Sequence, residues 1–189
     1  MAERAGARES ELSLVEADGV RFGSLTDPRT RNAQHATNHA MARILIVSSV
    51  GGHLDEVMQL APLLERHEVS LVVNERCELP VFDFGRVYRI CHAERDWRVV
   101  KNLTEAARIL LSELPDVILS TGAGPAVPFA VAARLLGNIR VVFTEIASAV
   151  VRPSLFGRIM YFLSHDFFYQ WPALARFFPK GKLVELTFR

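Results

Sequence analysis

From residue 41 onward, short runs of aliphatic residues alternate with segments whose apolar residues recur every three or four positions. Continuous aliphatic runs are typical of strands buried on both faces, whereas the three- to four-residue recurrence is typical of amphipathic helices. The runs predict strands over residues 43–49, 69–73, 86–90, 116–120, 139–145, 165–169 and 182–186.

The segments between these strands predict helices over residues 54–66, 101–114, 124–137 and 154–164. Asn102 and Ser154 are expected to cap two of them, while Pro115 and Gly137 are expected to end two of them. Strands that alternate with helices form a parallel sheet covered on both faces. We therefore predict an α/β fold, with a Rossmann-like parallel sheet, in a single domain over residues 41–189.

The first forty residues are polar and show no sustained period, and we expect a flexible N-terminal extension over residues 1–40. An alternative interpretation is that Met41 is the natural start of the protein. No stretch of the chain has the length and apolarity of a transmembrane helix, and the N-terminus lacks the apolar core of a secretory signal.

The composition of the 189-residue chain excludes several classes of protein. Half of its residues are hydrophobic and 23% are charged, which is typical of a globular protein rather than a disordered one. A net charge of +1 gives no general attraction to nucleic acid. Cys77 and Cys91 form no metal-binding motif, so we expect reduced thiols in a cytosolic protein with no metal and no cofactor.

Candidate chemistry lies where predicted strands end. In open parallel sheets, ligands bind at the carboxyl ends of strands, and a helix that starts there favours phosphate. Three stretches lie at such ends: SSVGGHLDE (48–56), STGAGPAVP (120–128) and TEIASAVVRPS (144–154). None matches GxGxxG or a P-loop, which disfavours a dehydrogenase or a P-loop enzyme. The alternative is that their glycines form ordinary turns.

Two side chains in these stretches are candidates for proton transfer. His53 follows two glycines, and a neutral imidazole there can accept a proton from an attacking hydroxyl. Glu145 ends a predicted strand and is a candidate base or ligand for sugar hydroxyls. The alternatives are a polar helix-cap histidine and a solvent-exposed strand end. For Asp55 and Glu56 we expect only a favourable interaction with the helix dipole.

These stretches, together with the segment PSLFGRIMYFLSHDFFYQW, resemble exopolysaccharide and capsule biosynthesis proteins of the PssD type. A eukaryotic relative of that family is the membrane-recruiting subunit of the split UDP-N-acetylglucosamine transferase. The resemblance covers nearly all of residues 41–189, and the combination of STGAG with the later QW is fairly specific. It implies the N-terminal half of a GT-B glycosyltransferase.

The resemblance also implies a partner and a site. A separate catalytic chain would bind the UDP-sugar donor, and this chain would bind a polyprenyl-diphosphate-linked sugar acceptor at the cytoplasmic face of a membrane. Half a cleft cannot enclose both substrates, which agrees with that expectation. His53 and Glu145 are then the catalytic candidates, and the candidates for substrate binding are Gly51, Gly52, Ser120, Thr121, Gly122, Ala123, Gly124 and Ser148.

The sequence departs from that family at two places. The eukaryotic relatives begin with a transmembrane anchor, and no such segment is visible in this sequence, so we expect peripheral association with the inner face of the plasma membrane. Between the glutamate and the proline of EIASAVVRP, this chain has Ala147 and Ala149 where the family carries more polar residues.

Aromatic residues are concentrated near the C-terminus. Residues 152–189 hold ten of the seventeen aromatics and six basic residues against two acidic ones, a mixture that suits a lipid headgroup region or a protein interface. The alternative is a buried core. The candidates for contact with a membrane or a partner are Phe156, Tyr161, Trp171, Phe177 and Phe178.

Three functions remain open from the sequence. The first is a two-component glycosyltransferase in polysaccharide or lipid-linked oligosaccharide biosynthesis, with this chain binding the acceptor and recruiting its partner. The second is a non-catalytic recruitment module whose glycine stretches are structural. The third is a self-contained nucleotide-binding enzyme, which the missing phosphate-binding motifs disfavour.

Overall fold

A computed structural model describes residues 41–49, 51–74, 82–90, 98–122 and 124–184. The predicted N-terminal extension, Cys77, Cys91, Ala123 and the end of the last predicted strand lie outside these residues.

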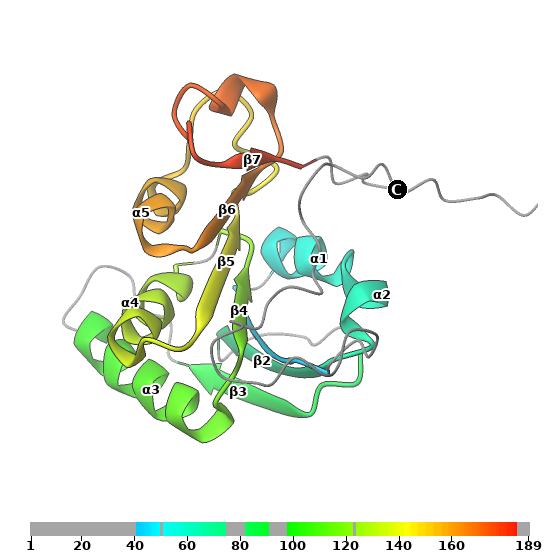
Figure 1. Ribbon diagram of the computed structural model, residues 1–189, viewed down its shortest axis with the longest axis vertical. Coiled ribbons are helices and arrows are strands. Elements are labelled where there is room, and N and C mark those ends of the chain that lie inside the picture. The colour runs from blue at the N-terminus through cyan, green and yellow to red at the C-terminus, as the bar shows by residue number, and fades with distance from the viewer. Residues whose placement is uncertain (1–40, 50, 75–81, 91–97, 123, 185–189) are drawn as a thin grey trace, which may run out of the picture. The chain divides into compact units, whose positions relative to one another are not determined.

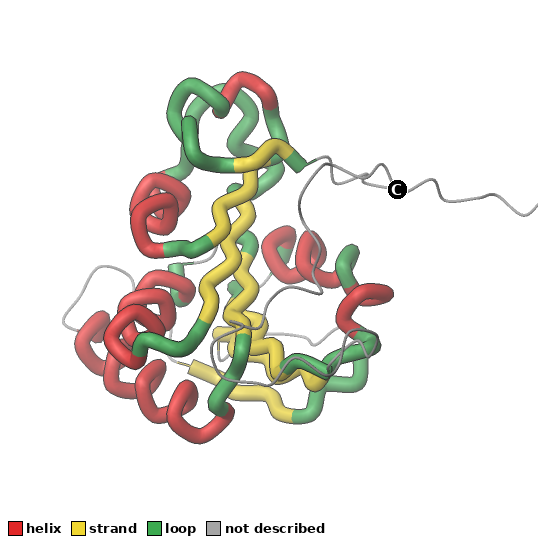
Figure 2. The backbone as a smooth tube through the Cα atoms, viewed as in Figure 1, coloured by secondary structure: helices red, strands yellow, loops and turns green. Residues whose placement is uncertain are grey.

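The described residues contain a seven-stranded parallel sheet in the order β3-β2-β1-β4-β5-β6-β7 (Figures 1 and 2). The predicted fold class is therefore confirmed. The order reverses between β1 and β4, the switch point at which such sheets bind ligands. The strands are β1 (Arg43–Val47), β2 (Glu68–Asn74), β3 (Arg86–Ile90), β4 (Val117–Ser120), β5 (Arg140–Thr144), β6 (Asp166–Tyr169) and β7 (Lys182–Leu183).

Helices cover both faces of the sheet, with α1 and α2 on one side and α3, α4 and α5 on the other (Figure 1). This division follows from the strand order. The chain moves outward from β1 to β3 in one half of the sheet and outward from β4 to β7 in the other, and right-handed connections in these two directions lie on opposite faces. The helices are α1 (Gly52–Met58), α2 (Ala61–Leu64), α3 (Arg98–Glu113), α4 (Ala126–Leu136), α5 (Leu155–Leu163) and the 3₁₀ turn η2 (Pro172–Leu174).

Two details of the predicted helices are wrong. The helix expected over residues 54–66 is divided into α1 and α2, because Pro62 lacks an N–H and its ring clashes with a carbonyl one turn earlier. Asn102 does not cap α3, which begins four residues earlier and buries Asn102 within the helix. No proline or glycine in residues 98–101 stops the helix from starting there.

The expected ends of the other helices are confirmed. Gly137 follows α4 with a left-handed φ of 82°, and its N–H donates to the carbonyl of Ala133. The Ser154 hydroxyl accepts from the Gly157 N–H at 2.8 Å and caps α5. These two caps satisfy backbone groups that would otherwise lack partners at the helix ends.

The apolar core lies between the sheet and the helices, and β4 and β5 are buried along nearly their whole length. Its C-terminal part is aromatic: the ring centroid of Phe167 lies 4.4 Å from that of Phe178 and 5.5 Å from that of Phe143. Phe178 is 2% exposed, so the expectation that it contacts a membrane or partner is wrong. The turn after η2 folds its ring inward, onto β6.

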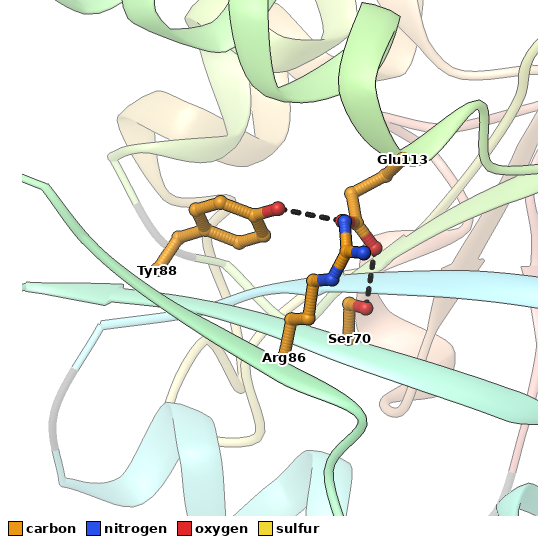
Figure 3. A network of polar contacts seen from close by, with 4 residues as sticks. All are labelled: Ser70, Arg86, Tyr88 and Glu113. Carbon is orange, nitrogen blue, oxygen red and sulfur yellow. Dashed lines mark hydrogen bonds and ion pairs between the residues drawn. The ribbon is translucent and has the colours of Figure 1, made fainter.

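A polar network ties α3 to the sheet near the amino ends of the strands (Figure 3). Glu113 accepts from the Ser70 hydroxyl at 2.6 Å, from the Tyr88 hydroxyl at 2.6 Å and from the Arg86 guanidinium at 2.9 Å. Partial burial alone would raise the pKa of Glu113, but these hydrogen bonds and the Arg86 charge lower it below its ordinary value. A cavity of about 500 Å³ lies beside this network, at the amino ends of the strands.

We predict that Glu113→Gln lowers the free energy of unfolding by about 1–3 kcal/mol at pH 7, because charge-assisted hydrogen bonds are lost. The folded-state pKa of Glu113 is depressed, so its stabilisation is present above the unperturbed value of 4.5 and is lost as the pH falls through the folded value. The difference between wild type and variant should therefore narrow in acid, as measured by urea denaturation across pH.

Glu65→Gln is the matched control, because it removes the same charge from an exposed side chain. It should change stability by less than about 0.5 kcal/mol. A Glu113→Gln stability loss that does not vary with pH would contradict the assigned role.

Candidate functional site

Three loops meet at the carboxyl edge of the sheet. We call them the first loop (48–52, after β1), the second loop (120–125, from the end of β4) and the third loop (145–153, after β5). Since β1, β4 and β5 are neighbouring parallel strands, these loops leave the same edge side by side. The first two flank the switch point of the sheet.

His53 and Thr121 join the first helix to the second loop by two reciprocal hydrogen bonds. The Nδ1 of His53 contacts the Thr121 carbonyl, and the Thr121 hydroxyl donates to the His53 carbonyl at 2.6 Å. A carbonyl oxygen only accepts, so Nδ1 carries the hydrogen and the Nε2 lone pair is left available. The half-buried imidazole is therefore held in the tautomer that a general base requires.

Gly122 lets α1 and the third loop pack against the second loop. Its φ is +92°, a left-handed conformation that residues with a side chain rarely adopt. A Cβ at this position would lie 2.9 Å from the His53 ring and 3.2 Å from the Cβ of Ile146 in the third loop. The missing side chain is thus what allows the imidazole and the third loop to pack against the second loop.

Glu145 is 0% exposed, so the alternative of a solvent-exposed strand end is wrong. Its carboxyl lies beneath the first turn of α5, where a Cβ on Gly157 would come within 1.4 Å of Oε2. Neither carboxyl oxygen has a hydrogen bond of standard geometry within the described part of the chain. Burial raises the pKa of Glu145, while nearby groups of Ser154, the Ile146 amide and the proximity of His53 oppose that rise.

Glu56 is not merely a helix-dipole partner, and that expectation is wrong. It is buried, and its Oε1 accepts from the Ala147 N–H of the third loop at 3.0 Å. Burial raises the pKa of Glu56, as does the nearby Glu145 charge, while hydrogen bonds from Ala147 and Gln170 lower it. Asp55 is exposed in the first turn of α1, as a dipole partner would be.

The QW pair after β6 also holds the third loop, a role that the sequence analysis missed. The Gln170 amide donates to the Glu145 carbonyl at 3.1 Å, and the Trp171 indole donates to the Ala147 carbonyl at 2.6 Å. Polar residues directly after a strand of this sheet were the available signal, because β6 ends at the same edge as β5.

The other predicted binding residues take different positions. Gly51 and Gly52 are exposed at the start of α1, and Ser148 is exposed on the third loop. Ser120 is fully buried, and its hydroxyl has no hydrogen-bond partner among the residues described. Gly124 lies against α5, since a Cβ there would meet the Phe156 ring at 3.1 Å. Ser120 is therefore positioned as part of the loop's support rather than its surface.

Apolar side chains are exposed along α5. Phe162 is 78% exposed, and Leu155, Phe156 and Ile159 are exposed beside it on the helix. Trp171 and Phe177 are also exposed, whereas Tyr161 is half-buried, with its hydroxyl accepting from the Lys180 N–H. Within the described ranges, no helix has the length and apolarity needed to cross a bilayer, and no three metal-binding side chains cluster.

We predict that Gly122→Ala lowers the free energy of unfolding by about 2 kcal/mol, because the new Cβ adds a clash to an unfavourable φ. Gly52→Ala is the control, since a Cβ there meets nothing within 4 Å and φ is not left-handed. It should be neutral or stabilising by about 0.5 kcal/mol in the same denaturation experiment. Equal effects of the two variants would contradict this packing.

Comparison with solved structures supports the fold. Acinetobacter baumannii MurG matches with a TM-score of 0.64 at 20% identity, over 76% of this chain and 45% of MurG. A UDP-GlcNAc 2-epimerase from Methanocaldococcus jannaschii matches with a TM-score of 0.53 at 16% identity, over 71% of this chain and 41% of the epimerase. This chain therefore spans less than half the length of either protein, and at these identities the likeness concerns the fold alone.

Sequence relatives match over most of their length. UDP-N-acetylglucosamine transferase subunit ALG14 of Rattus norvegicus is 39% identical over 171 residues, covering 73% of this chain and 79% of the relative. The subunit of the same name from Mus musculus is 28% identical over 181 residues, covering 78% and 83%. Residues 91–186 match the family model described as oligosaccharide biosynthesis protein Alg14 like. The chain therefore belongs to the Alg14-like family of oligosaccharide biosynthesis proteins.

Proposed function

We propose that this chain is the acceptor-binding subunit of a two-component glycosyltransferase of the bacterial PssD type. A donor-binding partner brings the UDP-sugar, and the sugar passes to a polyprenyl-diphosphate-linked saccharide in polysaccharide or lipid-linked oligosaccharide biosynthesis. The observation that carries the proposal is the oriented imidazole of His53 at the meeting point of three loops, in a chain of the Alg14-like family. The relatives' names describe a transferase subunit, which supports a partner.

In this proposal, His53 is the base. Its Nε2 takes the proton of the acceptor hydroxyl while the hydroxyl oxygen bonds to the anomeric carbon of the donor sugar and the UDP leaves. Thr121 keeps the imidazole in the required tautomer. The buried carboxyl of Glu145 lies near His53 and stabilises the imidazolium that forms.

The second loop is the proposed position of the acceptor diphosphate. It leads directly into α4, an eleven-residue helix whose N-terminal amides and dipole favour negative charge. Gly51, Gly52 and Ser148, exposed on the neighbouring loops, are proposed to line the same site.

We also propose that the outer face of α5 contacts the cytoplasmic surface of the membrane. Residues 146–165 contain no acidic side chain, and Arg152 and Arg158 are exposed among the apolar residues of this segment. Such a helix lies in the headgroup region, where its apolar side chains are buried and its arginines attract anionic lipids. Trp171 and Phe177 are exposed as well and add to the candidates for membrane or partner contact.

The second candidate function is a recruitment module without a catalytic role. It is favoured because side chains of the site already contact one another: Glu145 is buried, and Thr121 and His53 are hydrogen-bonded to each other. In that case the three loops only stabilise the surface on which the partner docks.

His53→Ala distinguishes the two functions. With the partner chain co-expressed, and with labelled UDP-N-acetylglucosamine and a panel of short-chain polyprenyl-diphosphate-linked sugars, we expect kcat to fall by about 10²–10⁴-fold. His67→Ala is the control because His67 lies at the opposite edge of the sheet. Wild-type turnover in the His53 variant would favour the recruitment module.

Ile159→Ser combined with Phe162→Ser tests the membrane surface. The double variant should reduce the partition coefficient onto phosphatidylglycerol-containing vesicles by on the order of 100-fold, because two exposed apolar side chains no longer enter the interface. Leu63→Ser, at an exposed position on α2 at the other face of the sheet, should float like the wild type. Unchanged flotation of the double variant would show that α5 does not contact lipid.

A further inference from the structure

The backbone of the third loop is held at Ala147 from two opposite sides. Its N–H donates to the Glu56 carboxyl at 3.0 Å, and its carbonyl accepts from the Trp171 indole at 2.6 Å. The carbonyl of Glu145, two residues earlier, accepts from the Gln170 amide. These three side chains come from α1 and from the segment after β6, so elements on both sides of the loop fix its position.

The spacing on α1 gives this arrangement a consequence for the candidate site. Glu56 lies three residues after His53, and side chains at that spacing share one face of a helix. His53 reaches the second loop and Glu56 reaches the third loop. One short helix therefore sets the distance between the imidazole and both neighbouring loops.

The placement of Glu56 is costly for a carboxyl group, because it is only 6% exposed and Glu145 lies near it. Its Oε2 has no hydrogen bond of standard geometry among the residues that the structure describes, so Oε1 makes the defined contact with the loop. Two other titratable groups lie close by. Glu145, just after β5, raises the pKa of Glu56, and His53 of α1 lowers the pKa of Glu145. The useful property of Glu56 is its acceptor oxygen, which an uncharged amide also provides.

We propose that Glu56 is a positioning residue for transfer, and that with Trp171 it fixes the third loop at the distance from His53 that the acceptor sugar requires. The proposal rests on the proposed function, because it concerns the same site. Glu56 does not touch the reacting atoms. It acts through the Ala147 backbone, and small misplacements of a reacting pair lower the rate strongly.

The test compares Glu56→Ala, Glu56→Gln and Asp55→Ala in the complex with the partner chain, using labelled UDP-N-acetylglucosamine and the same polyprenyl-diphosphate-linked acceptors. We expect Glu56→Ala to lower kcat by about tenfold or more while the KM for the nucleotide sugar, which the partner binds, stays unchanged. Glu56→Gln should restore most of the loss because its amide oxygen accepts from Ala147. The exposed Asp55 is the matched control on the same helix.

Amide hydrogen exchange provides a second readout. The Ala147 amide should exchange faster in Glu56→Ala than in Glu56→Gln, and Trp171→Phe, which keeps a ring but removes the indole N–H, should reproduce the kcat loss if Glu56→Ala fails to fold. A folded Glu56→Ala variant with wild-type kcat, or a glutamine variant as impaired as alanine, overturns the positioning role alone. A wild-type complex that transfers no sugar to any acceptor overturns the proposed function as well.

Discussion

The candidate site depends on the reciprocal hydrogen bonds between His53 and Thr121. They join α1 to the loop after β4, across the point where the strand order reverses. Every open parallel sheet has loops at its carboxyl edge, but the sheet itself does not fix one loop against the next. Here His53 and Thr121 each use a side chain and a backbone carbonyl to make that connection, and Gly122 provides the space in which the imidazole lies.

Around that link the protein buries two carboxyl groups, Glu56 and Glu145, at the end of an otherwise apolar sheet. Burial raises the pKa of both, and the nearby Glu145 raises that of Glu56 further. Such groups are expensive to bury unless hydrogen bonds or charges compensate. Ala147 and Gln170 compensate at Glu56, and Ser154, the Ile146 amide and His53 compensate at Glu145. Burial of the two carboxyl groups costs stability, and their contacts fix the geometry of the third loop.

The fold was predictable because its strands are buried on both faces, and a continuous run such as ILIV permits little else. Pro62 was a visible signal for the break between α1 and α2, but the apolar spacing that continues past it masked the signal. Glu56 was not predictable, because its partner lies 91 residues away and an acidic residue near a helix start has a simpler explanation. Phe178 was misjudged because Phe177 and Phe178 are neighbours of the same type with opposite exposure, which only the turn after η2 decides.

Gly157 has a consequence that reaches beyond the stability of α5. Its missing side chain lets the helix rest directly on the Glu145 carboxyl, while the opposite side of the same helix carries Ile159 and Phe162 to solvent. The thickness of one α-helix, about 10 Å, therefore separates the buried acid from the outer apolar surface. If that surface rests on lipid, the proposed reacting centre is held at a fixed height above the bilayer, within reach of the diphosphate headgroup of the proposed acceptor, whose hydrocarbon chain never leaves the membrane.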